Sequence, residues 1–318
     1  MAEIRHVQIW GAGAMGSLYA WKFFQAEGMS VSLIAGGERA RRLSAEGLCV
    51  NGNRFRPEVV DLAGDSEASE LIVVALKHHH LVGAVDEVAA AVGPDTLFLS
   101  VMNGIDSEAI LGGRYGPEKV LPAVALGMDA LREKGNVVFT RAGRILFGPP
   151  AGRENPSSAV GRVQRAFDRA DIDWEVPSDI HRALWWKLMI NVGVNQTSAV
   201  LRAPFGVFHT CPAARTLMVS AMQEVIAVAR RKGIDLSDED IGEWLSVLSG
   251  LSPEGKTSML QDVEAGRKTE VEIFAGRIVS EGRRCGVPTP VNETLLQILQ
   301  VYEQRRGGEV LIPCPIDT

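Results

Sequence analysis

The first half of the chain alternates short apolar runs with longer amphipathic stretches. The run at residues 71–76 is apolar throughout, which is typical of a strand buried on both faces. The predicted strands are residues 7–10, 30–34, 71–76 and 96–101, and the predicted helices are residues 14–27, 40–46 and 81–92. This alternation predicts an α/β fold in which helices cover a parallel sheet.

The pattern changes in the middle of the chain. Residues 136–140 and 144–148 are two apolar runs joined by a short polar turn, which predicts a hairpin that closes the sheet. A helix at 159–170 and a strand at 173–176 complete the first domain. Asp179 is a plausible N-cap for a new helix. Beyond it the helices are expected at residues 179–200, 211–232, 238–249, 257–265, 270–285 and 291–304. We therefore expect two domains, residues 1–178 and 179–318.

Composition and charge restrict the class of protein. Hydrophobic residues make up 46% of the 318 positions and charged residues 23%, which is ordinary for a globular protein. The formal net charge of -6 argues against a nucleic-acid partner or an anionic membrane surface. No apolar run is long enough to span a bilayer, and the first residues lead into a strand rather than a signal peptide. The four cysteines have no metal-binding spacing. We expect a cytoplasmic protein with free thiols and no bound metal.

A glycine-rich segment follows the first predicted strand. Residues 11–16 are Gly11-Ala12-Gly13-Ala14-Met15-Gly16, which is the pattern G-x-G-x-x-G. Between a strand and a helix this pattern predicts a dinucleotide site, although it can also be a merely tight turn. Gly11 permits the turn, Gly13 lets the backbone approach the pyrophosphate, and Gly16 lets helix and strand pack closely. The helix N-terminus then faces the phosphate charge.

The end of the second strand indicates which dinucleotide binds. An acidic residue there binds the ribose 2′-hydroxyl of NAD, but residues 34–37 contain no carboxylate. Glu38 follows, together with Arg39, Arg41 and Arg42. Guanidinium groups suit a phosphate monoester, so the segment favours NADP. Some of these arginines can equally belong to a solvated helix face.

Lys77 and Asn103 come at the ends of two further strands. Ligands of open α/β sheets bind outside the carboxyl ends of the strands, so both residues are candidates for the cofactor crevice. A lysine at a strand end is often only solvated, and Asn-Gly is often only a turn. No carboxylate or cysteine has an obvious metal-ligand spacing to the three histidines His78-His79-His80. This favours a solvated helix start over a metal site.

The segment 184–195 carries polar groups in apolar surroundings. Lys187, Asn191 and Asn195 are spaced by four residues, so a regular helix places them on one face. Buried amides and ammonium groups need partners. A bound carbonyl or carboxylate would supply them, and a structural hydrogen-bond network is the alternative.

Residues 257–272 contain the signals of a helix end and a helix start. Gly266 has the position of a C-terminal glycine, and Thr269 with Glu272 has the spacing of a capping box. Glu270 is then expected in the first helical turn, where its simplest role is an interaction with the helix dipole.

Taken together, these motifs resemble the ketopantoate reductase family from the glycine-rich loop almost to the C-terminus. The resemblance rests on the glycine-rich loop, residues 76–77, Asn103-Gly104, residues 186–188 with Asn191 and Asn195, and residues 258–262 with Thr269-Glu270. It implies a Rossmann-type dinucleotide-binding domain followed by an all-helical domain of the 6-phosphogluconate dehydrogenase C-terminal type. The implied reaction is NADPH-dependent reduction of 2-dehydropantoate to D-pantoate, a step toward pantothenate, by a monomer or homodimer.

The resemblance also implies residue roles. Lys187 is the expected general acid, and Glu270 the expected acidic residue that holds substrate and supports catalysis. The cofactor is expected at Gly11, Ala12, Gly13, Ala14, Met15, Gly16, Arg39, Lys77 and Asn103. The substrate is expected at Lys77, Asn103, Asn191, Asn195 and Ser258.

Two positions depart from the family pattern, and three other functions are compatible with parts of the sequence. Gly36 stands where the family usually has an arginine, so the 2′-phosphate contact is assigned to Arg39. Gly255 stands where some members have an asparagine that contacts substrate. The alternatives are a paralogous reductase of another 2-keto acid, a dinucleotide-sensing protein without catalysis, and a β-hydroxyacid dehydrogenase of the 6-phosphogluconate type.

Overall fold

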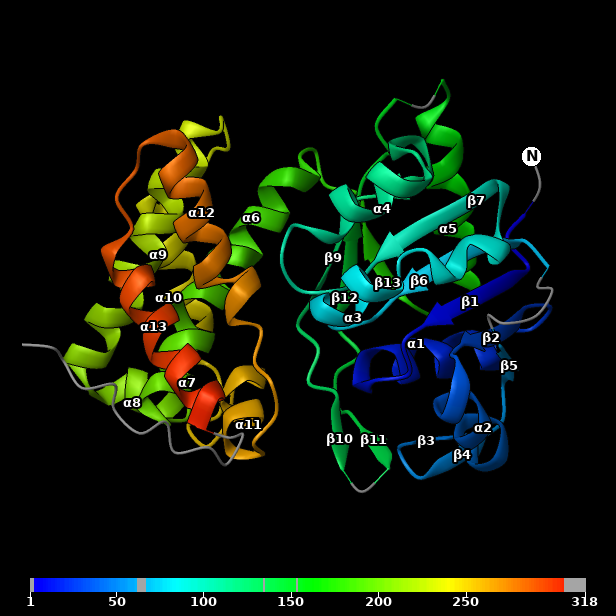
Figure 1. Cartoon of the computed structure of the whole chain (residues 1–318), viewed down its shortest axis with the longest axis horizontal. Helices are drawn as coiled ribbons and strands as arrows, with labels where there is room; N and C mark the ends of the chain where they lie inside the picture. Colours follow the sequence, from blue (N-terminus) through cyan, green and yellow to red (C-terminus); the bar gives the residue numbers. More distant parts are fainter. Residues whose placement is uncertain (1–2, 62–66, 134, 153, 306–318) are drawn as a thin grey trace, which may run out of the picture. The chain divides into compact units, whose positions relative to one another are not determined.

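The chain folds into two compact units. The computed structural model describes residues 3–61, 67–133, 135–152 and 154–305 (Figure 1). The units are Met1–Leu184 and Trp185–Thr318, and the division falls inside helix α6 (Ile180–Ile190). The boundary expected from the sequence lies just before the same helix. Each unit is described by itself below.

The first unit contains a six-stranded parallel sheet. Its strand order is β5-β2-β1-β6-β7-β8, the order of a Rossmann domain, in which the order of the parallel strands reverses between β1 and β6. The strands are β1 (His6–Trp10), β2 (Ser30–Ile34), β5 (Glu58–Val60), β6 (Ser69–Val74), β7 (Val92–Ser100) and β8 (Val120–Leu121). All four strands predicted for this half are present, so the predicted parallel sheet is confirmed.

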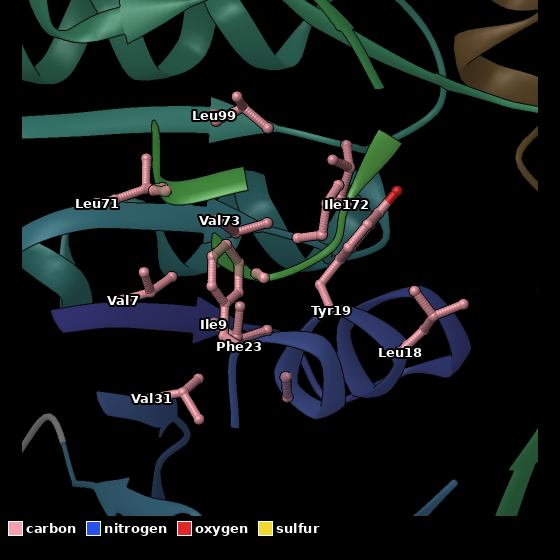
Figure 2. Packing of buried hydrophobic residues seen from close by; sticks show 14 of the residues in the cluster. Val7, Ile9, Leu18, Tyr19, Phe23, Val31, Leu71, Val73, Leu99 and Ile172 are labelled. Carbon is pink, nitrogen blue, oxygen red and sulfur yellow. The ribbon is translucent and has the colours of Figure 1, made fainter. Parts of the chain in front are cut away.

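Both faces of the sheet are buried because its central strands carry apolar side chains at successive positions. On β6, Leu71 and Val73 pack in one hydrophobic cluster, whereas Ile72 and Val74 pack in another. The first cluster includes α1 (Ala14–Gln25), whose Tyr19 and Phe23 lie against the sheet in Figure 2. The second is covered by α3 (His78–Ala84) and α4 (Ser107–Tyr115). A continuous apolar run is therefore the expected sequence of β6.

Tyr19 places a hydroxyl inside this core. Its side chain is 2% exposed, and its Oη has no hydrogen-bond partner in the described part of the chain. Burial raises the pKa of Tyr19 above its ordinary value. A buried hydroxyl without a hydrogen-bond partner lowers the stability of the fold, because unfolding restores its hydrogen bonds to water.

We expect Tyr19→Phe to raise the free energy of unfolding by about 1 kcal/mol, since it removes only the unmet group. Urea denaturation measures this change. Tyr115→Phe is the matched control, because the Tyr115 hydroxyl donates to the Val85 carbonyl and its loss should be destabilising. A destabilised Tyr19→Phe variant would show that the hydroxyl has a partner in solution.

The predicted hairpin at 136–148 is wrong. Strand β11 (Asn136–Val138) pairs antiparallel with β10 (Leu131–Glu133) and parallel with β3 (Leu48–Val50). Strand β12 (Arg144–Phe147) instead joins another sheet, between β9 (Ala123–Leu126) and β13 (Asp173–Glu175).

Asp129 explains where the chain leaves the hairpin. Its carboxylate accepts the backbone N–H groups of Thr140 and Arg141, and its own N–H donates to the Arg141 carbonyl. These bonds hold residues 140–141 in a loop between the two sheets. The hairpin therefore forms one strand earlier than predicted, with β10 and β11 beside β3 and β4 (Asn53–Phe55) (Figure 1).

Beyond β13, every described element is helical, which confirms the predicted helical second domain. Besides α6, the α-helices are α7 (Gln196–Leu201), α8 (Phe205–Thr210), α9 (Pro212–Arg231), α10 (Asp238–Ser249), α11 (Ser258–Glu264), α12 (Ala275–Cys285) and α13 (Pro290–Gln304). The Asp179 side chain accepts the Arg182 N–H, as predicted for an N-cap. Gly266 has a φ of +65°, as expected past the end of α11. No described helix combines the length and apolar character needed to cross a membrane.

Candidate functional site

The glycine-rich loop has the backbone geometry of a phosphate-binding turn. Gly11 has a φ of +112°, and a Cβ there would lie 2.6 Å from the Ala75 carbonyl oxygen. A Cβ on Gly16 would lie 1.8 Å from the Gly11 carbonyl oxygen, so neither position accepts a side chain. Gly13 faces open space, and α1 begins directly after it with no side-chain cap. The loop therefore fits a dinucleotide, because the first N–H groups of α1 are left for an anion.

Lys77 and Asn103 share a sheet edge with this loop. Strands β1, β6 and β7 are parallel neighbours, and Trp10 pairs with Val74, which pairs with Ser100. The three segments that follow these strands thus leave the sheet at one edge. Lys77 is the N-cap residue of α3, and both it and Asn103 are half-buried and have polar partners. The predicted grouping of loop, lysine and asparagine is consistent with this topology.

The histidines after Lys77 begin α3, as expected for a helix start. His79 and His80 are exposed, with ring centroids 4.2 Å apart. Within the described residues, no group of His, Cys, Asp and Glu side chains has the arrangement of a metal site.

Arg39 lies in the first turn of α2 (Gly37–Glu46), directly after β2. Burial lowers the pKa of its guanidinium, and the nearby charges of Arg132 and Arg42 lower it further. Gly36 and Gly37 have open space where a Cβ would stand. Arg132, on β10, was not singled out from the sequence, because nothing local relates it to α2.

Glu108 is a second residue that the sequence did not reveal. It lies at the start of α4, in a hydrogen-bonded chain in which Ser100 Oγ donates to Ser107 Oγ, and Ser107 Oγ to Glu108 Oε2. Burial raises the pKa of Glu108 to about 7, although hydrogen bonds from its own backbone, Ser107 and Ala123 oppose the shift. The carboxyl group, at the start of the helix that follows the Asn103 segment, therefore has a pKa near neutral pH.

This titration predicts a pH-dependent stability. The folded pKa of Glu108, about 7, lies above the ordinary value of about 4.3. The stability that this group contributes is fully present at a pH below its ordinary pKa, which applies to the unfolded chain. It is lost as the pH rises from there through the folded pKa of about 7. Glu108→Gln should remove that loss. The free energy of unfolding of the variant minus that of the parent should rise by about 2–3 kcal/mol from about pH 5 to about pH 8. Urea titrations at both values measure it, and a constant difference would contradict the assignment.

In the second unit, Lys187 lies in the last turn of α6. Burial lowers the pKa of its ammonium group below the ordinary value. Because burial causes this shift, the ammonium group lies in poorly solvated surroundings. A lysine with a lowered pKa gives up its proton more readily near neutral pH, which suits a general acid.

The helix predicted for 179–200 is interrupted after Lys187. Residues Asn191–Asn195 form a π-helical turn, a feature frequently found at functional sites. Gly193 permits close packing there, since a Cβ would lie 2.4 Å from Met222 Cε on α9. Thr197 Oγ1 donates to the Gly193 carbonyl at 2.7 Å, which satisfies a carbonyl of the wider turn. The prediction of a regular helix was wrong, because the sequence gives no local signal for the π turn.

Asn191 and Asn195 remain neighbours in spite of the π turn. They are 3% and 9% exposed, and Asn195 Nδ2 donates to Asn191 Oδ1 at 3.1 Å. Asn191 Nδ2, by contrast, is buried and has no hydrogen-bond partner in the described structure. An unmet amide donor of this kind fits an oxygen atom of a ligand.

Gln196 holds the π turn in place. Its Nε2 donates to the Val192 carbonyl and to Asn292 Oδ1 on α13, and its Oε1 accepts the Ala275 N–H at the start of α12. Asn292 in turn bonds to Glu224 on α9. The buried amide of Gln196 thus connects the π turn to α12 and α13, and Asn292 extends the network to α9.

Ser258 is the first residue of α11 and is exposed. Helix α11 packs against the π turn and α7, and its N-cap Thr257 donates to Ser198 Oγ at 3.2 Å. The structure therefore places Ser258 on an element adjacent to the asparagine pair.

The capping box predicted for Thr269 and Glu272 is wrong. Thr269 donates through its N–H and its hydroxyl to Glu303 of α13, while Glu272 pairs with Lys268 at 3.1 Å. Helix α12 begins only at Ala275. Glu270 precedes a 3-10 turn (Val271–Ile273), is 7% exposed and has polar partners. It is a buried carboxylate before the 3-10 turn, whereas the first turn of an α-helix was predicted.

The parallel sheet with its glycine-rich loop, followed by a helical unit, defines a two-domain protein with a Rossmann-type dinucleotide-binding domain. The family model described as ketopantoate reductase PanE/ApbA matches residues 7–152, and its C-terminal model matches residues 179–303. The chain therefore belongs to the ketopantoate reductase family, a family of oxidoreductases, which confirms the resemblance found in the sequence.

Individual relatives agree with this assignment. A 2-dehydropantoate 2-reductase of Archaeoglobus fulgidus is 29% identical over 301 residues, covering 95% of this chain and 99% of the relative. The solved 2-dehydropantoate 2-reductase of Geobacter metallireducens has a TM-score of 0.83 at 26% identity, covering 93% and 99% of the two chains. A D-mandelate dehydrogenase solved with NADH and anilino(oxo)acetate has a TM-score of 0.86 at 22% identity, covering 95% and 99%. The last likeness shows the fold alone.

Proposed function

We propose that this protein reduces 2-dehydropantoate to D-pantoate with NADPH. The observation that carries the proposal is the buried polar set of the helical unit. Lys187 has a lowered pKa, and Asn191 has a buried amide donor with no partner among the described residues. Such donors suit the oxygen atoms of a 2-keto acid. A protein that only senses dinucleotides would not need them.

In this proposal, the bound cofactor supplies a hydride to the 2-keto carbon. The carbonyl oxygen then acquires negative charge, which the Lys187 ammonium stabilises and neutralises by donating a proton. Asn191 and Asn195 orient the substrate, because Gln196 fixes the turn that carries them. Glu270 accepts a hydrogen bond from the substrate's hydroxyl. Lys77, Asn103 and Ser258 supply further polar contacts.

The cofactor half of the proposal rests on the first unit. The glycine-rich loop (Gly11 to Gly16) binds the pyrophosphate at the start of α1. Arg39 and the absence of a carboxylate in residues 34–37 favour NADPH over NADH.

A second function, reduction of another 2-keto acid, is favoured by one observation. A Cβ on Gly255 would lie 2.9 Å from the Phe205 ring and 3.0 Å from the Ser252 carbonyl oxygen. An asparagine would not fit there without a shift, so an amide contact to substrate from this position is lost.

A steady-state assay separates the two functions. The kcat/KM values of 2-dehydropantoate, 2-ketoisovalerate and phenylglyoxylate should be compared under NADPH and under NADH. We expect 2-dehydropantoate with NADPH to give the highest value. A higher value for either of the other keto acids would favour the second function.

Lys187→Ala should lower kcat by about 10²–10⁴-fold, the usual effect of losing a positioned general acid. The dissociation constant of NADPH should stay nearly constant, because the Rossmann-type unit binds it. Lys187→Arg keeps the positive charge but gives up no proton near neutral pH, so it should remain slow. If Lys187→Ala retains the parental kcat with chemistry rate-limiting, Lys187 is not the acid.

Glu270→Ala should erase the preference for 2-dehydropantoate over 2-ketoisovalerate, which lacks the distal hydroxyl. A polar group built to bind a hydroxyl is left unpaired when that hydroxyl is missing. The expected loss in kcat/KM for 2-dehydropantoate is on the order of 2–4 kcal/mol. An equal loss for both keto acids would show that Glu270 does not bind the hydroxyl. Glu270→Gln, which keeps an acceptor, should lose less.

A further inference from the structure

The β10–β11 hairpin brings an arginine onto the glycine-rich loop. Arg132 Nη1 donates to the Ala12 carbonyl oxygen at 3.1 Å, which joins residues 120 positions apart. Ala12 is the second residue of the loop, directly after the turn at Gly11. A guanidinium group has five N–H donors, so this bond leaves others for a ligand.

The positive charge of the same guanidinium also acts on Arg39 of α2. Together with the charge of Arg42, it lowers the pKa of Arg39 after the larger effect of burial. Among the residues that the structure describes, Arg39 and Arg42 form no ion pair with a carboxylate. Adjacent positive charges repel one another, and a bound anion relieves that repulsion.

The hairpin has a fixed position in the first unit. Strand β11 pairs in parallel with β3, the strand that follows α2, and α1 packs against β11. Asn51 closes the arrangement: its Nδ2 donates to the Phe139 carbonyl, and its Oδ1 accepts the Phe139 N–H at 2.9 Å. Arg132 is thus presented by β10, a strand of a hairpin that is tied to its surroundings.

An anion bound at this place would lie at the ribose end of a dinucleotide. Strands β1 and β2 are parallel neighbours that end together at Trp10 and Ile34. The glycine-rich loop follows β1, and Gly36 and Gly37 with open space around them follow β2. In Rossmann domains the adenosine ribose contacts the end of the second strand. Arg132 is bonded to the glycine-rich loop at Ala12, and Arg39 lies in the first turn of α2.

We propose that Arg132 and Arg39 bind the 2′-phosphate of the cofactor from two sides, so that the β10–β11 hairpin determines cofactor specificity. The inference rests on the proposed use of NADPH. Planar guanidinium groups form paired hydrogen bonds with phosphate oxygens, and two of them match the double charge of a phosphate monoester. Gly36, which has no side chain, leaves the space for this group.

Two small ligands test the proposal with the full-length protein. Adenosine 2′,5′-bisphosphate carries the 2′-phosphate, and 5′-AMP lacks it. Isothermal titration calorimetry should show that the parent binds the bisphosphate more tightly. Arg132→Ala should weaken the bisphosphate by about 10–100-fold, the effect of losing hydrogen bonds to a charged group, and leave 5′-AMP nearly unchanged. Arg132→Lys should lose less.

Arg54→Ala is the matched control. Arg54 lies on β4, at the other edge of the same four-stranded sheet, and is exposed. Its removal should leave both affinities unchanged. Arg39→Ala should resemble Arg132→Ala, and the double variant should lose less than the sum of the two if both arginines hold one phosphate.

The possible outcomes separate this inference from the proposed function. If the parent shows no preference for the bisphosphate, NADPH specificity and the 2′-phosphate site are both wrong. If the parent prefers it and Arg132→Ala keeps that preference, NADPH specificity stands and the role of Arg132 is wrong. If Arg132→Ala weakens both ligands equally, the arginine only supports the glycine-rich loop, and the inference is again overturned.

Discussion

The close packing of the glycine-rich loop against the end of β6 is the constraint on which the first unit depends. The Gly11 and Gly16 backbones approach Ala75 and each other so closely that a Cβ at either position would collide with a carbonyl oxygen. This packing brings the start of α1 to the same sheet edge as Lys77 and Asn103, because β1, β6 and β7 are parallel neighbours. Anion binding at the helix start thus follows from backbone geometry.

A comparable constraint operates in the helical unit through hydrogen bonds. The buried amide of Gln196 joins the π turn to the start of α12 and to Asn292 of α13. Breaking one of these bonds would leave a buried polar group unmet, so the network resists displacement of the turn. Asn191 is thereby held so that its Oδ1 accepts a hydrogen bond from Asn195, while its Nδ2 has no hydrogen-bond partner among the described residues. Ligand-binding capacity here results from a rigid surrounding structure.

Charge is placed differently in the two units. In the first, the charges of Arg132 and Arg42 act on Arg39, and burial raises the pKa of Glu108 at the start of α4 to about 7. In the second, burial lowers the pKa of Lys187 in the last turn of α6. Arg39, Glu108 and Lys187 are each kept in an environment that disfavours the charged form, which is typical of sites that bind or transfer charge.

The sequence by itself determined the parallel sheet, the helical second domain and the glycine-rich loop. The sheet and the helices depend on local periodicity, and the loop depends on glycines, whose backbone adopts conformations that other residues avoid. Tertiary structure decided the hairpin partner of β11, the π turn at Asn191 and the start of α12, where Asp129, Gly193 and Glu303 act through distant contacts. It also brought Arg132 to Ala12, which lies 120 positions away. Such contacts depend on how the strands pair and the helices pack, and that information is absent from any local window of the sequence.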